Sequence, residues 1–243
     1  MTRLLAIDTS SAWCSVALSL DQQAPHLRHE LLLAGASQNL LPWVDDLLAE
    51  AAIGLKELDA IAVGIGPGAF TGVRLGVAAV QGLAVAADLP VIPVASLDAL
   101  ASQLHSRPGF VQVLPEHFVI AIDARMDEIY WALYSFSGLD GTSTRIGDIH
   151  LSKPEEIDLS NAQYIAGSAL TAYGARLFAN HSLPESAQDA DISISALGII
   201  NCAQQALKRN LQIPVTDLEP LYVRDKVALT TKERILAFGK EQA

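Results

Sequence analysis

A glycine-rich run, GIGPGAFTGVRLG at residues 64–76, is the part of this chain whose composition most suggests chemistry. It follows the apolar stretch 61–63 and contains five glycines, one proline and one arginine. A strand, a glycine turn and a helix start in this order can cradle a phosphate, because glycines let backbone amides come close to an anion. The run could serve as a nucleotide site, as a packing device, or as a surface on which another protein docks.

Two standard nucleotide motifs fail on this run. A P-loop needs G-x-x-x-x-G-K-[ST], but five residues separate Gly66 from Gly72 and Val73 stands in place of the lysine. Residues 64–69 match the dinucleotide pattern G-x-G-x-x-A, yet Pro67 removes an amide that a pyrophosphate would use. Neither a P-loop nor a dinucleotide fold is therefore expected.

Two roles remain for the run. Its backbone amides, the positive end of the following helix and Arg74 together suit an anion. Alternatively, small residues recur along one helix face and let another backbone approach closely, which needs no ligand. We favour the packing interpretation, because glycine repeats of this kind indicate close approach before they indicate chemistry. The small residues are Gly72, Gly76, Ala79, Gly82 and Ala86. The motif loop is defined by Gly66, Pro67, Gly68, Phe70, Thr71, Gly72 and Arg74.

Histidines and serines do not form a convincing catalytic or metal site. His26 and His29 are a close pair, but on a strand a spacing of three directs the rings to opposite faces, so they cannot share one metal. Ser15, Ser96 and Ser168 lack the G-x-S-x-G context of a nucleophile elbow. We therefore predict no catalytic and no metal-binding residues.

Hydrophobic periodicity and turn residues predict the elements that position these residues. Apolar runs predict strands at residues 4–7, 14–20, 29–33, 60–65, 91–94, 118–123, 128–136 and 164–166. Helices are predicted at residues 37–52, 71–87, 169–179 and 195–210, the first with Ser37 as its N-cap.

An internal repeat divides the chain. AIDTSSAWCSVALSL begins at Ala6 and AIDARMDEIYWALYSF at Ala121, 115 residues later, and each opens with a strand, a turn and a second strand. A duplication is the economical explanation. We predict an α/β fold with halves at residues 1–105 and 106–243, a linker near residues 102–116, and a mobile, partly helical tail from about Thr230.

Composition narrows the functional classes. A net charge of −11 argues against independent nucleic-acid binding, because affinity for phosphates is largely electrostatic. Cys14 and Cys202 alone make no disulfide framework, and the apolar run before Asp8 is too short for a signal peptide, so a cytoplasmic protein is expected. The apolar segment 75–87 falls short of the roughly 18 to 20 residues of a membrane span.

Several motifs in the right order resemble the bacterial TsaB family, also called YeaZ, the partner subunit in synthesis of the threonylcarbamoyladenosine of transfer RNA. The resemblance covers most of the chain, and the glycine run is its most specific motif. The other motifs are Asp8-Thr-Ser10 with Ser15-Val-Ala-Leu18, Ser37-x-x-Leu-Leu-Pro42, Asp123-Ala-Arg125 with Glu128 and Tyr130, Gly167, and Pro220-Leu-Tyr-Val-Arg224. Ala69 and Ala36 depart from the family's usual serine and histidine.

The resemblance implies an actin-like ATPase (ASKHA, ribonuclease H-like) fold of two duplicated halves. It also implies a catalytic paralogue, TsaD, whose metal is held by a His-x-x-x-His pair at the helix start after the strand here placed at residues 91–94. Ser96 and Leu100 occupy those two positions. Because leucine cannot coordinate a metal, the transferase chemistry is not expected here. Asp8 and Asp123, where such ATPases place acids around nucleotide, are interpreted as turn caps of a vestigial nucleotide cleft.

The function implied is a non-catalytic scaffold that pairs with TsaD and helps recruit the ATPase TsaE. Transfer RNA is then bound only through partners, no cofactor belongs to this chain, and a nucleotide at the partner boundary stays an alternative. An isolated chain could cover the same surface as a homodimer. The competing hypothesis is a stand-alone ATPase or a glycoprotease-like hydrolase. The predicted partner-binding residues are Leu40, Val44, Leu47, Leu48, Val73, Val77 and Val80.

Overall fold

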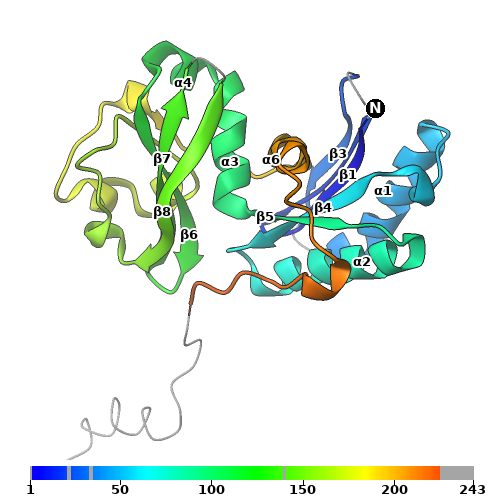
Figure 1. The fold of residues 1–243 in the computed structure, drawn as a ribbon. Coiled ribbons are helices and arrows are strands. Elements are labelled where there is room, and N and C mark those ends of the chain that lie inside the picture. Colours follow the sequence, from blue (N-terminus) through cyan, green and yellow to red (C-terminus); the bar gives the residue numbers. More distant parts are fainter. Residues whose placement is uncertain (1, 21–22, 33–34, 139–140, 225–243) are drawn as a thin grey trace, which may run out of the picture.

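Two lobes, each built on a five-stranded sheet, make up the protein in a computed structural model that describes residues 2–20, 23–32, 35–138 and 141–224 (Figure 1). The first sheet has the order β3-β2-β1-β4-β5 and the second β10-β9-β6-β7-β8. In each sheet the first hairpin is antiparallel and the inner strand then pairs in parallel with a later strand. The two sheets thus share one topology, which confirms the predicted duplication.

The first sheet contains β1 (Arg3–Asp8), β2 (Trp13–Leu20), β3 (His26–Leu31), β4 (Ala60–Gly66) and β5 (Val91–Ala95). The second contains β6 (His117–Arg125), β7 (Glu128–Ser137), β8 (Thr142–Ser152), β9 (Tyr164–Ala166) and β10 (Gln188–Asp189). The helices are α1 (Ala36–Glu50), α2 (Phe70–Ala87), α3 (Ser96–Gln103), α4 (Pro108–Val113), α5 (Ala169–Tyr173) and α6 (Ala196–Lys208). Short 3₁₀ turns link them, including η6 (Val215–Asp217).

Alternating side chains of β1 fill two different cores. Leu5 and Ile7 face the layer of α1 and α2, whereas Leu4 and Ala6 face α3 and α6. This alternation follows from the two-residue period of a strand, and it explains why a strand covered by helices on both sides is almost wholly apolar. The α3 and α6 layer continues into the second lobe, and a third cluster packs beneath α5.

The C-terminal part of the described chain returns to the first lobe. Helix α6 packs on the first sheet, and the backbone amide of Ala196 at its start donates a 2.9 Å hydrogen bond to the Ser15 hydroxyl. Beyond η6, residues 218–224 run along the lower edge of the molecule from α2 toward the second lobe (Figure 1). The predicted boundary near residue 105 stays a prediction, and the predicted tail from Thr230 lies outside the described residues.

Three local predictions need correction. Helix α1 begins one residue before Ser37, and its N-cap is Gly35 in the left-handed region, with no side-chain cap bond. The supposed linker holds the end of α3, a 3₁₀ turn and α4, and its Leu104 and Phe110 are fully buried. The predicted helix at residues 169–179 is a short α-helix followed by a 3₁₀ turn from Gly174.

Helix α2 is long and apolar enough by length and composition to cross a membrane, with a hydropathy of 1.5 over its 18 residues. The core helix of a soluble protein passes the same test. Here α2 packs against β4 and β1 of the first sheet, with 33% of its 18 residues buried.

Candidate functional site

The turn after β1 and the start of α2 are in direct contact. The Thr9 hydroxyl donates a 2.6 Å hydrogen bond to the Gly72 carbonyl, and the Ala69 amide donates one of 2.6 Å to the Ser10 carbonyl. A Cβ atom added to Gly68 would overlap the Ser10 carbonyl oxygen, and one added to Gly72 would overlap that of Thr9. Glycine is needed at both positions because any side chain would push these backbones apart.

The remaining small residues of α2 divide into two groups. Gly76 still faces the chain itself, since an added Cβ would lie 2.8 Å from the Thr9 hydroxyl oxygen. Gly82 has nothing within 4 Å, and Ala86 beside it is exposed. The small residues at the start of α2, Gly72 and Gly76, therefore pack inside the protein. Gly82 and Ala86 near its end present a smooth, apolar surface to the outside.

Asp8 is a fully buried carboxylate at the end of β1. The Ser10 amide and hydroxyl donate bonds of 3.0–3.1 Å to it, and the Ser96 hydroxyl donates a 3.1 Å bond to that of Ser10. A Cβ on Gly64 would overlap the carboxylate. Burial raises the pKa of Asp8 to about 6, although the bonds from Ser10 lower it. The group closes its own turn and has little room for a ligand.

Asp123 closes the equivalent turn of the second lobe. Its carboxylate accepts a 2.8 Å hydrogen bond from the Arg125 amide and a 2.9 Å bond from the Tyr173 hydroxyl, and it forms a 3.0 Å ion pair with the Arg125 guanidinium. Both aspartates thus cap turns, and the vestigial nucleotide cleft itself stays a prediction. Within the described residues, each aspartate accepts hydrogen bonds from residues of its own lobe.

Ser96 and Leu100 lie where the family resemblance places metal ligands. Both are on α3, directly after β5, and are 2% and 3% exposed. Leu100 belongs to the hydrophobic core that the lobes share, while Ser96 donates to Ser10. Within the described ranges, no group of three or more histidine, cysteine, aspartate or glutamate residues could hold a metal ion.

Ser15, Ser168 and His29, which the sequence offered as candidates for chemistry, have structural contacts. The Ser168 hydroxyl accepts a 3.1 Å hydrogen bond from the Asp123 amide, as that of Ser15 does from the start of α6. The His29 ring stacks on Trp13 with 4.4 Å between ring centroids. Burial lowers the pKa of His29, which favours a neutral ring in this stack.

The predicted partner-binding side chains are core residues. All seven are at most 7% exposed and belong to the cluster between the first sheet and its α1 and α2 layer. The prediction chose the inward faces of the two helices because an apolar face looks the same in sequence whether it meets a sheet or another protein. Leu41 on α1 and Phe70 and Val85 on α2 are 47%, 58% and 70% exposed and form the outward apolar positions. Docking on these helices itself stays a prediction.

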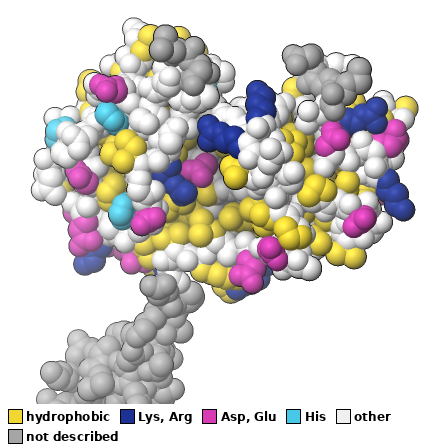
Figure 2. Space-filling view, viewed as in Figure 1, with side chains coloured by type: hydrophobic (Ala, Val, Ile, Leu, Met, Phe, Trp, Pro, Cys, Tyr) yellow, Lys and Arg dark blue, Asp and Glu magenta, His cyan; other side chains and the backbone are white. Residues whose placement is uncertain are grey.

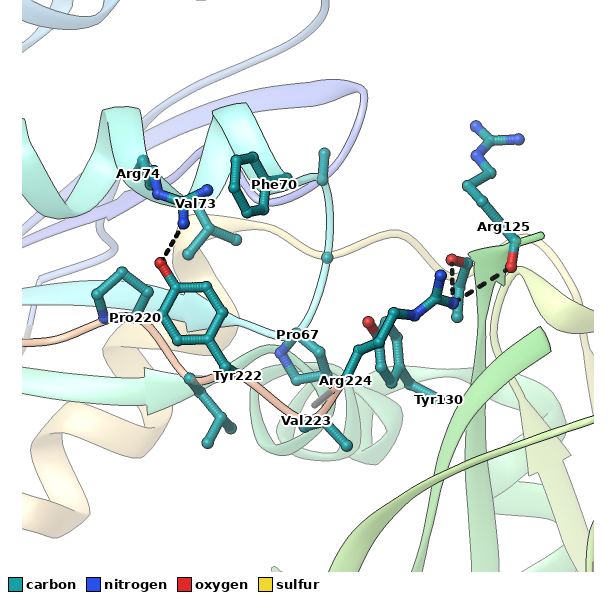
Figure 3. A pocket seen from close by; sticks show the side chains of 14 residues that line it. Pro67, Phe70, Val73, Arg74, Arg125, Tyr130, Pro220, Tyr222, Val223 and Arg224 are labelled. Atoms are coloured by element: carbon teal, nitrogen blue, oxygen red, sulfur yellow. Dashed lines mark hydrogen bonds between the residues drawn. The ribbon is translucent and has the colours of Figure 1, made fainter. Parts of the chain in front are cut away.

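A cavity of about 220 Å³ lies between the motif loop, the β6–β7 hairpin and the C-terminal segment (Figure 3). We call it the arginine cavity, and its lining residues are Pro67, Gly68, Ala69, Phe70, Val73, Arg74, Ala124, Arg125, Tyr130, Pro220, Leu221, Tyr222, Val223 and Arg224. Anion binding by the motif loop was the less favoured of its two interpretations, and the opposing residues were not selected as site residues. Tyr222 and Arg224, which follow Pro220 in the sequence, were the signal from which these residues could have been predicted.

The C-terminal segment is fixed on both sides of the arginine cavity. The Leu221 amide donates a 2.8 Å hydrogen bond to the Ile65 carbonyl of the first lobe. Arg224 donates a 3.2 Å bond to the Ala124 carbonyl and pairs with Glu128 of the second lobe at 2.6 Å. Residues 221–224 therefore bridge the two lobes and form one wall of the cavity.

Two halves of equal topology, each opening with a hairpin whose first strand carries an aspartate at or near its end (Asp8 in β1, Asp123 in β6), define an actin-like, ribonuclease H-like protein. The model of the family TsaD, tRNA N6-adenosine threonylcarbamoyltransferase, matches residues 33–239. The tRNA threonylcarbamoyladenosine biosynthesis proteins TsaB of Haemophilus influenzae and Escherichia coli are 36% and 35% identical to this chain. These alignments cover 92% and 93% of this chain and 94% and 96% of the relatives.

Solved structures agree with the sequence relatives. YeaZ from Pseudomonas aeruginosa superposes with a TM-score of 0.79 at 35% identity, over 91% of this chain and all of the other. A protein described as similar to peptidase YeaZ, also from Pseudomonas aeruginosa, gives a TM-score of 0.80 at 36% identity, over 92% of this chain and 100% of the other. The chain belongs to the TsaB (YeaZ) family, which confirms the resemblance.

Proposed function

We propose that this chain is the non-catalytic scaffold of the machinery that makes threonylcarbamoyladenosine in transfer RNA. In this role it forms a heterodimer with TsaD, the metal-containing paralogue, and helps to recruit the ATPase TsaE. The TsaB relatives of Haemophilus influenzae and Escherichia coli are named as proteins of this biosynthesis. The division of labour between subunits is our inference from the residues described above.

The observation that carries the proposal is that Ser96 and Leu100 are engaged in structural contacts. At the positions where the resemblance puts the catalytic metal ligands, the chain has a hydroxyl already donated to Ser10 and an aliphatic side chain in the core. An aliphatic side chain has no donor atom for a metal. At 3% exposure it is buried among apolar side chains, an environment that disfavours an ion. This arrangement supports an accessory subunit that retains the fold of an enzyme.

The outward face of α2 supports docking to a partner. Gly82, Val85 and Ala86 are exposed on this face, and small residues there let a partner helix approach closely. Figure 2 shows hydrophobic side chains gathered on the lower part of the lobe that carries α2. Exposed apolar patches of this kind are typical of protein interfaces. TsaD is the proposed occupant, and a second copy of the chain covers the face when TsaD is absent.

The net charge supports the proposal that the partners make the RNA contact. At −11 the chain repels a phosphate backbone, so we propose that transfer RNA reaches the complex through TsaD. We also propose a cytoplasmic location, no resident cofactor, and room for a nucleotide only at the boundary with the partner.

Reconstitution of the transfer RNA modification from purified subunits tests this function. We expect modification to require this chain, and Leu41→Glu combined with Val85→Glu to abolish both the heterodimer and the activity, because two charges would be buried against the partner. Val111→Glu is the matched control, since Val111 is 48% exposed on α4 in the other lobe. Full activity without the chain would refute the proposal.

Calorimetric titration with ATP and magnesium tests the competing hypothesis. A scaffold gives no heat of tight binding and releases no phosphate when alone. Turnover of ATP by the isolated chain would instead establish a stand-alone ATPase, and cleavage of a glycoprotein would establish a hydrolase.

A further inference from the structure

The arginine cavity combines apolar walls with cationic groups. Phe70 and Val73 of α2 lie on one side, Tyr130 of β7 on another, and residues 220–223 form the floor (Figure 3). Tyr130 is 9% exposed, whereas Phe70 and Tyr222 at the rim are more than half exposed. The cavity therefore has a buried aromatic side chain inside and two exposed aromatic rings at its opening.

The charge of the lining is opposite to that of the chain. Among the described residues, three arginines and no acidic residue line the cavity, although the chain carries 27 acidic and only 16 basic residues. Arg125 is paired with Asp123 and is 87% exposed, and Arg224 is paired with Glu128. Arg74 has no ion pair within the described residues; its Nη2 donates a 2.5 Å hydrogen bond to the Tyr222 hydroxyl. A positive charge thus remains without a counter-charge.

In the part of the chain that the structure describes, two guanidinium nitrogens at the cavity are buried without a hydrogen-bond acceptor, namely Nη1 of Arg74 and Nε of Arg224. A buried donor without a partner is costly, and the cost is larger for a charged group. The Phe70 ring lies 3.2 Å from the Arg74 guanidinium and is 58% exposed. Because this ring faces solvent, its displacement would open Arg74 to an entering acceptor.

The size of the cavity limits the ligand. Sites that enclose drug-sized molecules have volumes of roughly 300–1,000 Å³. At about 220 Å³ the arginine cavity is smaller, so it suits a compact molecule better than a whole nucleotide. The first residues of α2 line the same space, and the positive end of this helix adds to the attraction for an anion.

We propose that the arginine cavity binds a small organic anion, a phosphate or carboxylate carried on a compact apolar body such as an aromatic ring. The anionic group accepts from Arg74 and Arg224, while the apolar body contacts Tyr130 and the Phe70 and Tyr222 rings. Such a ligand contacts both lobes and the segment that bridges them. The inference does not depend on the scaffold function, because it concerns the isolated chain.

Calorimetric titration of the full chain tests the site, with phenyl phosphate, benzoate, inorganic phosphate and ATP as separate probes at fixed ionic strength. We expect phenyl phosphate or benzoate to bind with a dissociation constant below about 1 mM, and inorganic phosphate to bind at least about tenfold more weakly because it has no apolar body. Which of the first two binds more tightly tells whether the physiological group is a phosphate or a carboxylate.

Variants locate the binding. Arg74→Gln is expected to weaken it by about tenfold or more, because a charge-assisted hydrogen bond is lost, and Arg74→Lys by less, because the charge remains. Arg28→Gln is the matched control, since Arg28 pairs with Glu50 on the far side of the first lobe. If Arg74→Gln does not fold, a ligand-dependent rise in the melting temperature of the unchanged protein and of Arg74→Lys gives the same comparison.

Four results would overturn the proposal. The first is that neither aromatic acid binds at about 10 mM, roughly ten times the upper limit expected for the dissociation constant. The second is that inorganic phosphate binds as tightly as the aromatic acids, and the third is that ATP binds more tightly than they do. The fourth is that Arg28→Gln weakens binding as much as Arg74→Gln.

Discussion

The Thr9 hydroxyl donates a hydrogen bond of 2.6 Å to the carbonyl oxygen of Gly72, which joins the turn after β1 to the first turn of α2. This contact explains how the glycine run can follow a strand without forming a P-loop, because its glycines make room for the backbone of residues 9 and 10. The space in which backbone amides would meet a ligand is filled by residues 9 and 10 of the same chain. The phosphate-loop appearance of the run is thus a consequence of close packing between two backbones.

Gly72→Ala is predicted to destabilise the protein by about 1–3 kcal/mol, because the new methyl group would overlap the backbone oxygen of Thr9. Gly82→Ala on the same helix is the matched control. Nothing lies within 4 Å of an added Cβ there, so alanine is expected to stabilise by about 0.5–1 kcal/mol through its helix propensity. Urea unfolding measures both. Equal effects of the two substitutions would contradict the packing explanation.

Asp8 is predicted to weaken the folded state as the pH rises. Burial raises its pKa from 3.8 to about 6, so the folded state holds the proton more tightly than the unfolded state. The stabilisation is therefore complete below about pH 3.8 and is lost as the pH rises through about 6. The two-unit shift corresponds to roughly 3 kcal/mol.

Asp8→Asn is expected to remove this dependence. The free energy of unfolding of the variant minus that of the unchanged protein should rise by up to about 3 kcal/mol between pH 4 and pH 7.5. Chemical denaturation at several pH values measures the difference, in which contributions of all other groups cancel. A difference that stays constant across this range would show that folding does not raise the pKa of Asp8.

Leu47→Ala and Leu41→Ala distinguish the two faces of α1. Leu47 is fully buried in the core, so its truncation is expected to cost about 2–5 kcal/mol. Leu41 is 47% exposed, and its truncation should change stability by less than about 0.5 kcal/mol. Thermal or urea unfolding of the isolated chain gives both values. A large loss of stability for Leu41→Ala would place that side chain in the core instead of on the proposed docking face.

The repeat, the strand order of the hairpins and the small-residue packing of α2 could be read from sequence, because each depends on local pattern. Strand β8 could not, since its residues Thr142–Ser152 are only partly buried and show no apolar alternation. The seven core residues were taken for an interface because helix periodicity marks an apolar face without showing what covers it. The arginine cavity escaped prediction because residues about 150 positions apart in sequence, such as Arg74 and Tyr222, meet only in the folded chain.

The Arg107–Asp189 pair tests whether the supposed linker is structural. Arg107 precedes α4 and donates bonds of 2.7 and 2.9 Å to the two carboxylate oxygens of Asp189, which is 8% exposed and lies in β10. A bidentate bond to a nearly buried carboxylate is strong, but the 39% exposure of the arginine screens it in part. A double-mutant cycle with Arg107→Gln and Asp189→Asn is expected to give a coupling energy of about 1–2 kcal/mol.

The pair Arg3–Glu57, at 3.1 Å and with both side chains exposed, is the control, and its coupling energy should be below about 0.5 kcal/mol. Equal coupling in the two cycles would mean that residues near Arg107 connect the lobes without being fixed to the second sheet.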